Sequence, residues 1–257
     1  MRIALFTMES AASAEAVLRF AEGQGDRLVL VGHSPPLAAR RATWRALRGA
    51  GLGILPYLAV NHLVPGIGSS WRRPRRLSAL CAERGIRALR LRDEAAMRAA
   101  LRETGADLLV TFHLDRILGE ETLAVPSRGG INVHPSLLPR HRGPIPAFHA
   151  LAEGGTGVSV HALVARIDAG GIWAQREVTV PGGSSALAAA RELHLAAVPL
   201  VEEAIARIAA GEAVPAPPEP LPYRGWPARA QRRGAGVRLL RRSDLGTAWR
   251  APAGGWP

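Results

Sequence analysis

The opening of the chain constrains the fold more than any other segment. Residues 2–6 read as a short strand, residues 13–23 as a helix and residues 28–31 as a second strand. Two strands joined by one helix lie parallel in the same sheet, because a parallel pair needs a crossover connection. The opening therefore predicts an α/β protein with a Rossmann-like, mostly parallel sheet and helices on both faces.

The segments that follow continue this alternation of strands and helices. Further strands are expected at residues 88–91, 107–112, 129–133, 157–163 and 173–180. Further helices are expected at residues 35–48, 77–84, 94–104, 144–152 and 184–210. Pro199 is expected to break or kink the last of these helices. Asp93 is the expected N-cap of the helix at 94–104, and Gly105 is expected to close it.

The chain divides into a main domain, residues 1–212, and a small C-terminal extension, residues 213–257. The extension begins with a proline-rich stretch, residues 213–222, which is typical of a linker, and its arginines gather at residues 229–242. Residues 251–257 are expected to be disordered, as chain ends commonly are.

The apolar stretch at residues 52–64 has two interpretations, a core segment or an exposed contact surface. It is shorter than the roughly 20 residues that a membrane helix needs. Residues 1–6 form a strand rather than the long apolar run of a signal peptide. The sequence therefore predicts a cytoplasmic protein without a membrane partner, and it leaves the oligomeric state open.

The net charge of +12 would ordinarily indicate a nucleic-acid partner. All 33 basic residues are arginine, however, and alanine, glycine and proline are abundant, as a GC-rich codon bias would produce. We interpret the clusters at residues 72–76 and 229–242 as solvated or substrate-steering faces, with nucleic acid as the second choice. The single cysteine, Cys81, excludes an intrachain disulfide and a cysteine-rich zinc site.

The turn after the first strand, residues 7–13, contains no glycine and carries Glu9. A dinucleotide-binding turn has the pattern Gly-x-Gly-x-x-Gly at this place, because the backbone must approach the phosphates closely. The sequence therefore disfavours NAD, and it disfavours a phosphate cradle in this turn.

A pair of polar residues stands where the strand at 129–133 ends. Asn132 and His134 are two residues apart, so their side chains leave one face of the strand together. Pro135 ends the strand, because proline has no N–H to donate to the sheet. Reacting groups of α/β proteins lie at the carboxyl ends of the strands, which makes this pair the candidate centre of a site.

Four motifs occur in a fixed order around this pair. They are Asn-Val-His at 132–134, Ser-Leu-Leu-Pro at 136–139 followed by Gly143, Thr-Gly-Val-Ser-Val-His at 156–161 and Ile-Asp-Ala-Gly at 167–170. Together they resemble the 10-formyltetrahydrofolate-dependent formyltransferases, a family with methionyl-tRNA formyltransferase, glycinamide ribonucleotide transformylase and amino-sugar N-formyltransferases. The resemblance is strongest over residues 105–180. Glycinamide ribonucleotide transformylase holds its substrate phosphate in a glycine-bearing turn where this chain has residues 7–13, so the difference disfavours that substrate.

The resemblance implies a one-carbon transferase that moves a formyl group from 10-formyltetrahydrofolate to a primary amine through a tetrahedral oxyanion intermediate, without a metal. Its catalytic residues would be Asn132, His134 and Asp168. The uncharged amide of Asn132 would stabilise the oxyanion, and His134 would stabilise it or move a proton. Asp168 would hold His134 and help a water molecule to take the proton of the amine. The expected folate-binding residues are Arg116, Ile117, Leu118, His161 and Asp168.

The acceptor amine is not identified by these residues. A small molecule, an amino sugar or a biosynthetic intermediate, is the first choice, because the tRNA enzyme continues into a C-terminal β-barrel and residues 213–257 lack strand alternation. An aminoacyl-tRNA is the second choice, and a non-catalytic, folate-binding descendant is the third. Metal-dependent hydrolysis is disfavoured, since His134, His141, His149 and His161 are too far apart along the chain to share an ion on one helix.

Overall fold

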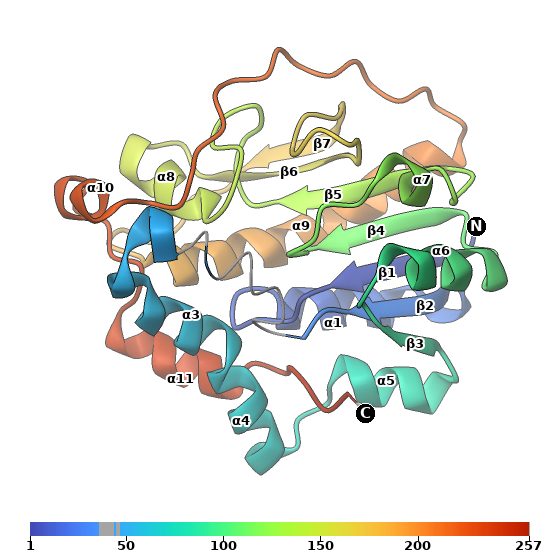
Figure 1. The fold of residues 1–257 in the computed structure, drawn as a ribbon, viewed down its shortest axis with the longest axis horizontal. Helices are drawn as coiled ribbons and strands as arrows, with labels where there is room; N and C mark the ends of the chain where they lie inside the picture. Colours follow the sequence, from blue (N-terminus) through green and yellow to red (C-terminus); the bar gives the residue numbers. More distant parts are fainter. Residues whose placement is uncertain (36–43, 45–46, 257) are drawn as a thin grey trace.

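The structure is a computed structural model that describes residues 1–35, 44 and 47–256. Its centre is a seven-stranded sheet in the order β3-β2-β1-β4-β5-β6-β7 (Figure 1). The strands are β1 (Ile3–Thr7), β2 (Leu28–His33), β3 (Arg87–Arg90), β4 (Leu108–Phe112), β5 (Gly130–His134), β6 (Gly157–Ala162) and β7 (Ile172–Glu177). All pairs from β3 to β5 are parallel, and only the pairs of β6 with β5 and β7 are antiparallel. The prediction of a mostly parallel sheet is confirmed.

Helices cover both faces of this sheet (Figure 1). The helices are α1 (Ala14–Gly23), α3 (Leu55–His62), α4 (Val64–Arg72), α5 (Leu77–Arg84), α6 (Glu94–Glu103), α7 (Glu120–Leu123), α8 (Pro146–Glu153), α9 (Ala186–Ala209), α10 (Arg229–Gly234) and α11 (Arg242–Arg250), with 3-10 turns at Gly25–Arg27 and Leu52–Ile54. Apolar residues of α1, α5 and α9 share one buried cluster, and those of α6 share another on the opposite face. Helices therefore flank the sheet as the opening of the chain predicts.

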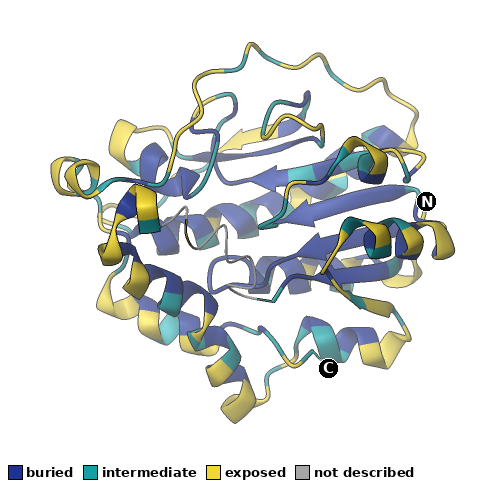
Figure 2. Ribbon diagram, in the orientation of Figure 1, coloured by how far each residue is buried: buried dark blue, intermediate teal, exposed yellow. Residues whose placement is uncertain are grey.

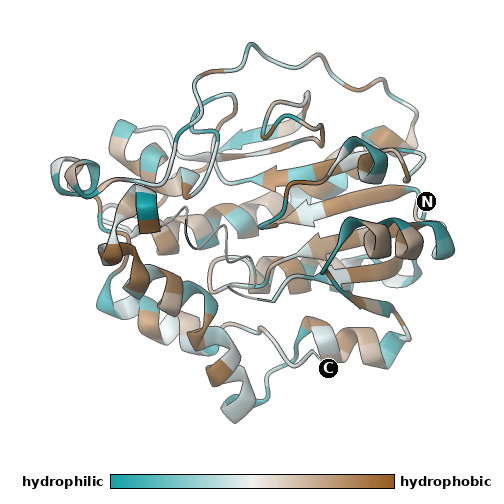
Figure 3. Cartoon of the chain, viewed as in Figure 1, coloured by the Kyte–Doolittle hydropathy of each residue, from teal (hydrophilic) through white to brown (hydrophobic). Residues whose placement is uncertain are grey.

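The alternation of side chains along β1 explains why the sheet has two covered faces. Ile3 and Leu5 belong to the cluster beneath α1 and α9, whereas Ala4 and Phe6 belong to the cluster beneath α6. A strand that is buried on both faces is apolar at nearly every position, as in doubly covered parallel sheets. The central strands are accordingly buried in Figure 2 and mostly hydrophobic in Figure 3.

The signals at the two ends of the helix expected at 94–104 are confirmed, whereas the break expected at Pro199 is not. The backbone N–H of Ala96 donates to Asp93 Oδ1 at 2.8 Å, so Asp93 caps α6. Gly105, with a φ of +56°, follows the end of this helix. α9 is one helix that contains Pro199, so the expected break is wrong, because packing against β6, β7, α1 and α8 holds the helix together. Of the helix expected at 35–48, residues 36–43 and 45–46 lie outside the described residues.

The apolar stretch 52–64 forms a 3-10 turn, α3 and the first residue of α4. Ile54 and Tyr57 are buried in a core cluster, whereas Leu55 and Leu63 are exposed. The core interpretation is therefore confirmed for one face, and a contact surface on the exposed face stays a prediction. No helix within the described residues is long and apolar enough to cross a membrane.

The C-terminal extension packs against the rest of the protein. The chain leaves α9, passes the β7 side of the sheet and returns to place α11 beside α3 and α4 (Figure 1). The expectation of disorder in the tail is wrong for residues 251–256. The Trp256 ring stacks on His33, with centroids 4.4 Å apart, and its Nε1–H donates to the buried carboxylate of Glu9 at 2.6 Å. Contacts with residues near the start of the chain therefore hold the tail in place, and the amino-acid composition of the tail gives no indication of these contacts.

Candidate active site

A cavity of about 440 Å³ lies at the carboxyl ends of β4 and β5. The three expected catalytic residues, Asn132, His134 and Asp168, all line it. So do the expected folate-binding residues Arg116, Ile117, Leu118 and His161. The fold therefore gathers every candidate residue of the sequence around one space, although they come from separate strands and loops.

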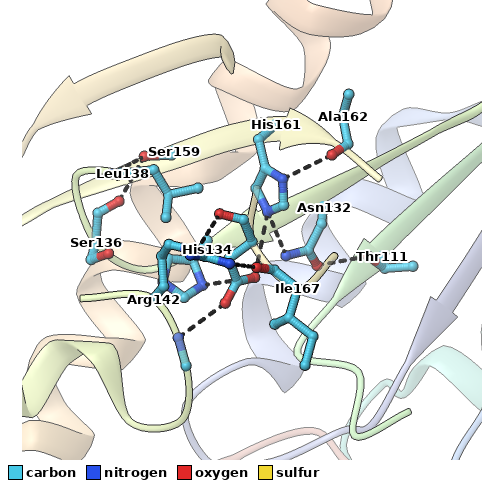
Figure 4. A network of polar contacts seen from close by, with 12 residues as sticks. Thr111, Asn132, His134, Ser136, Leu138, Arg142, Ser159, His161, Ala162 and Ile167 are labelled. Carbon is cyan, nitrogen blue, oxygen red and sulfur yellow. Dashed lines mark hydrogen bonds and ion pairs between the residues drawn. The ribbon is translucent and has the colours of Figure 1, made fainter. Parts of the chain in front are cut away.

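The Asn132 amide is held in one orientation by two neighbours (Figure 4). The Thr111 hydroxyl on β4 donates to Asn132 Oδ1 at 2.7 Å. Asn132 Nδ2 lies 3.0 Å from His161 Nε2, because the antiparallel register sets Asn132 opposite His161. The amide nitrogen has two N–H groups, so one remains for a ligand in the cavity.

The His161 ring acts as an acceptor toward this amide. Its Nδ1 donates to the carbonyl of Ala162 at 2.9 Å, which leaves the lone pair on Nε2. Burial lowers the pKa of His161 to about 4, against the opposing effect of the Asp168 carboxylate. The ring is therefore neutral at physiological pH and suited to fix Asn132.

His134 and Asp168 lie side by side in the cavity. Asp168 Oδ1 lies 3.5 Å from His134 Nδ1 and 3.7 Å from His161 Nε2. On the other side of the ring, His134 Nε2 lies 3.1 Å from the backbone oxygen of His141. Both nitrogens of His134 thus face oxygen atoms that can accept a hydrogen bond.

Arg142 is a site residue that the sequence analysis did not identify. Its buried guanidinium donates to the carbonyl of Ile167 (Figure 4), to that of Asp168 at 3.0 Å and to that of Leu221 at 3.1 Å. The backbone N–H of Gly143 donates to Asp168 Oδ2 at 3.0 Å. Asp168 has a φ of +49°, an uncommon conformation that these bonds hold in place. In the sequence, Arg142 stands directly before Gly143 of the motif. That position could have drawn attention to Arg142, but it does not show that the guanidinium binds backbone carbonyls.

The loop after β4 forms a wall that suits a flat heterocycle. Leu118 is buried and Ile117 is exposed at the cavity, which gives the wall an apolar surface. Asp115 Oδ1 and Arg116 Nε are buried there without a hydrogen-bond partner in the structure. A heterocycle with N–H and ring-nitrogen groups can pair with both, so these residues fit the pterin of a folate.

Three further histidines also line the cavity and were missed. His62 lies on α3, His113 follows β4 and His194 lies on α9. They are far apart in the sequence and share no motif, so only the packing of α3 and α9 around the sheet brings them together.

Comparisons with known proteins place this geometry in a family. The model of the formyl transferase family matches residues 70–204, which include Asn132, His134 and Asp168. The chain belongs to the formyl transferase family. A methionyl-tRNA formyltransferase of Roseiflexus castenholzii is 34% identical over 165 residues, 63% of this chain and 49% of that protein. One of Anaeromyxobacter dehalogenans is 33% identical over 213 residues, 81% of this chain and 64% of that protein. The chain thus spans about half to two thirds of the length of these relatives.

Solved structures of formyl transferases share the fold. A phosphoribosylglycinamide formyltransferase from Anaplasma phagocytophilum has a TM-score of 0.57 at 20% identity, covering 82% of this chain and 87% of that chain. A sugar N-formyltransferase from a Shewanella species has a TM-score of 0.56 at 16% identity, covering 99% of this chain and 89% of that chain. At these identities the likeness establishes the formyltransferase fold alone.

Proposed function

We propose that this protein transfers a formyl group from 10-formyltetrahydrofolate to a primary amine of a small molecule, an amino sugar or another biosynthetic intermediate. The observation that carries the proposal is the contact of Asp168 with His134 beside the oriented amide of Asn132, all within one cavity. We assign the catalytic domain to residues 1–212, with residues 213–257 as its extension, and the protein to the cytoplasm.

Asn132 and His134 are the donors that we assign to the formyl oxygen. The bound folate supplies an activated formyl carbonyl, and attack by an amine places negative charge on its oxygen. Asn132 offers its remaining Nδ2–H, and the contact of His134 Nδ1 with Asp168, at 3.5 Å, is long enough for a substrate oxygen to compete. Donors fixed before the charge develops stabilise it without reorganisation.

Asp168 is the group that we assign to the proton of the attacking amine. Its carboxylate is held by Gly143 N–H on one oxygen and faces His134 and His161 with the other. A carboxylate fixed beside the reacting carbon can accept the proton directly or through a water molecule. His134 is the group that we assign to the proton of the departing nitrogen, because a ring N–H placed in the cavity can donate to it.

The test is a screen of amines with purified protein and 10-formyltetrahydrofolate. Released tetrahydrofolate is followed by absorbance, and the formylated amine by mass spectrometry. We expect transfer to at least one small amine, and a rate about 10²–10³ lower with Asn132→Ala. Failure of every small amine, with folate binding intact, would contradict the small-molecule assignment.

An aminoacyl-tRNA acceptor is the second candidate, and two observations favour it. The two relatives above are named methionyl-tRNA formyltransferases, and the chain has a net charge of +12. Phosphate contacts make binding fall steeply with salt, with a slope of roughly −0.9 per contact for a duplex. Binding of tRNA at two salt concentrations separates the candidates: a steep slope with formylation of methionyl-tRNA would favour this second acceptor.

A further inference from the structure

The histidines that line the cavity apart from His134 and His161 form a connected cluster, His62, His113 and His194. The ring centroids of His62 and His113 are 5.6 Å apart, and those of His113 and His194 are 5.8 Å apart. Formyl transfer as proposed above uses none of them. Three imidazoles on one wall of an active-site cavity nevertheless present fixed polar groups to whatever the cavity binds.

All three rings are neutral. Burial lowers the pKa values of His62 and His194 to about 4 and that of His113 well below its ordinary value. Within the described part of the chain, Asp168 contacts His134 and His161 instead, and no carboxylate forms an ion pair with the cluster. A neutral imidazole has one donor and one acceptor nitrogen, so the tautomer decides what each ring can bind.

His62 presents a donor. Asn61 Oδ1 accepts from the backbone N–H of Ala12 at 3.1 Å, which fixes the Asn61 amide. Asn61 Nδ2 therefore lies 3.3 Å from His62 Nε2 and donates to it. The ring proton of a neutral His62 then lies on Nδ1, which is buried and has no partner in the structure.

His194 presents an acceptor. Its Nδ1 donates to the carbonyl of Ala190 at 2.7 Å, one turn earlier in α9. The lone pair of a neutral His194 is therefore on Nε2, which is also buried and without a partner in the structure. His113 stands between the two rings with its Nδ1 3.0 Å from the Ser10 hydroxyl. The cluster thus offers one unused N–H and one unused lone pair.

We propose that His62, His113 and His194 form the acceptor subsite and bind an uncharged, hydroxyl-bearing part of the amine substrate. Hydroxyl groups both donate and accept, so a part of the substrate that carries them can accept from His62 Nδ1 and donate to His194 Nε2. An ammonium only donates, and a phosphate or carboxylate only accepts, so each leaves one ring unsatisfied. The subsite rests on the proposed function, because it takes the cavity to hold the acceptor amine.

Two observations support this assignment. His194 lines the same cavity as Asn132, His134 and Asp168, which puts the subsite in the space where the proposed reaction takes place. Among residues 1–35, 44 and 47–256, no three His, Cys, Asp or Glu side chains are grouped to hold a metal ion. The proton on His62 Nδ1 also occupies the nitrogen that a metal would need.

The direct test uses histidine ring ¹⁵N spectra of the full chain without folate. The hydroxylated probes are 2-amino-2-deoxyglucose, serinol and trans-2-aminocyclohexanol, and the matched probe without a hydroxyl is cyclohexylamine. We expect a hydroxylated amine to shift His62 Nδ1 and His194 Nε2, and cyclohexylamine to leave both unchanged. Absence of a shift with every hydroxylated amine, or equal shifts with cyclohexylamine, would overturn the subsite, as would stoichiometric zinc binding that His194→Leu removes.

A kinetic test separates the subsite from the proposed function. His194→Leu is expected to raise the KM for a hydroxylated acceptor about tenfold or more and to leave that for cyclohexylamine unchanged. The control is His149→Leu, another buried histidine, which does not line the cavity. Ring shifts without formyl transfer to any amine would refute the function and keep the subsite. Transfer with a KM that His194→Leu does not change would refute the subsite alone.

Discussion

Asn132 owes its orientation to two neighbours of opposite hydrogen-bonding character. The Thr111 hydroxyl donates to its oxygen, and the neutral ring of His161 accepts from its nitrogen. An amide that is held in this way does not rotate when charge develops in front of it, which is the condition for efficient oxyanion stabilisation. The role that we propose for Asn132 therefore depends on Thr111 and His161, which fix its amide.

Asn132→Ala is expected to lower kcat by about 10²–10³, the effect of removing one oxyanion donor in other enzymes. Thr111→Val, which keeps the donor but removes one of its two supports, is expected to lower kcat less. Steady-state kinetics with a common acceptor measure both. Equal losses of kcat in the two variants would contradict the account, because they would mean that the N–H donor of Asn132 contributes nothing beyond its hydrogen bond with Thr111.

Arg142→Lys is expected to lower stability and activity together. The ammonium cannot reach the carbonyls of Asp168, Ile167 and Leu221 at once, and each buried polar group left without a partner costs about 1–3 kcal/mol. Urea unfolding measures the loss, and the exposed Arg166→Lys is the control. An unchanged urea midpoint in Arg142→Lys would show that the guanidinium does not hold the Asp168 loop.

Glu9 should give the stability of the protein a pH dependence. Burial raises its pKa from 4.5 to about 7, although the Trp256 N–H acts in the opposite direction. Between these values the folded protein keeps a proton that the unfolded chain loses, so the free energy of unfolding falls as pH rises from about 4.5 to 7. A tenfold difference in proton affinity between the folded and unfolded states changes this free energy by about 1.4 kcal/mol. The difference between the urea midpoints at pH 5 and pH 7.5 should be smaller in Glu9→Gln than in the wild type. The same difference in both proteins would show that Glu9 is not the source of the pH dependence.

At the scale of elements, α4 and α11 pack so closely that the contact needs a glycine. A Cβ at Gly68 of α4 would lie 2.1 Å from the backbone oxygen of Trp249 on α11. Backbone cannot move aside as a flexible side chain can. This contact joins the extension to the helices beside the cavity, where Tyr57 of α3 forms part of the wall.

Gly68→Ala is therefore expected to destabilise the protein by about 1–3 kcal/mol, the usual cost of overpacking. Gly66→Ala is the matched control, since a Cβ at Gly66 in the same helix meets nothing within 4 Å. Thermal or urea unfolding compares the two variants. A Gly68→Ala protein as stable as Gly66→Ala would mean that α11 is not seated on α4.

At the scale of the whole molecule, local sequence patterns indicate the sheet and the residues of the candidate site, but not the contacts between segments that are far apart in the chain. The spacing of Asn132 and His134 at a strand end predicts that both belong to the site, and the Ile-Asp-Ala-Gly motif predicts the same for Asp168. The hydrogen bond of Asn132 with His161 depends on an antiparallel register, and the cluster of His62 with His194 depends on how α3 and α9 close around the sheet. The ordered tail likewise depends on partners, Glu9 and His33, at the other end of the chain.

The central claim is that Asn132, His134 and Asp168 act on one folate-borne formyl group. The most direct measurement supplies 10-formyltetrahydrofolate with a deuterated formyl group and follows the label by mass spectrometry in the wild type and in Asp168→Asn. We predict one deuterated formamide for each tetrahydrofolate released, at a rate that Asp168→Asn lowers by about 10²–10⁴. Release of the label only as formate, or an Asp168→Asn rate equal to that of the wild type, would contradict this claim.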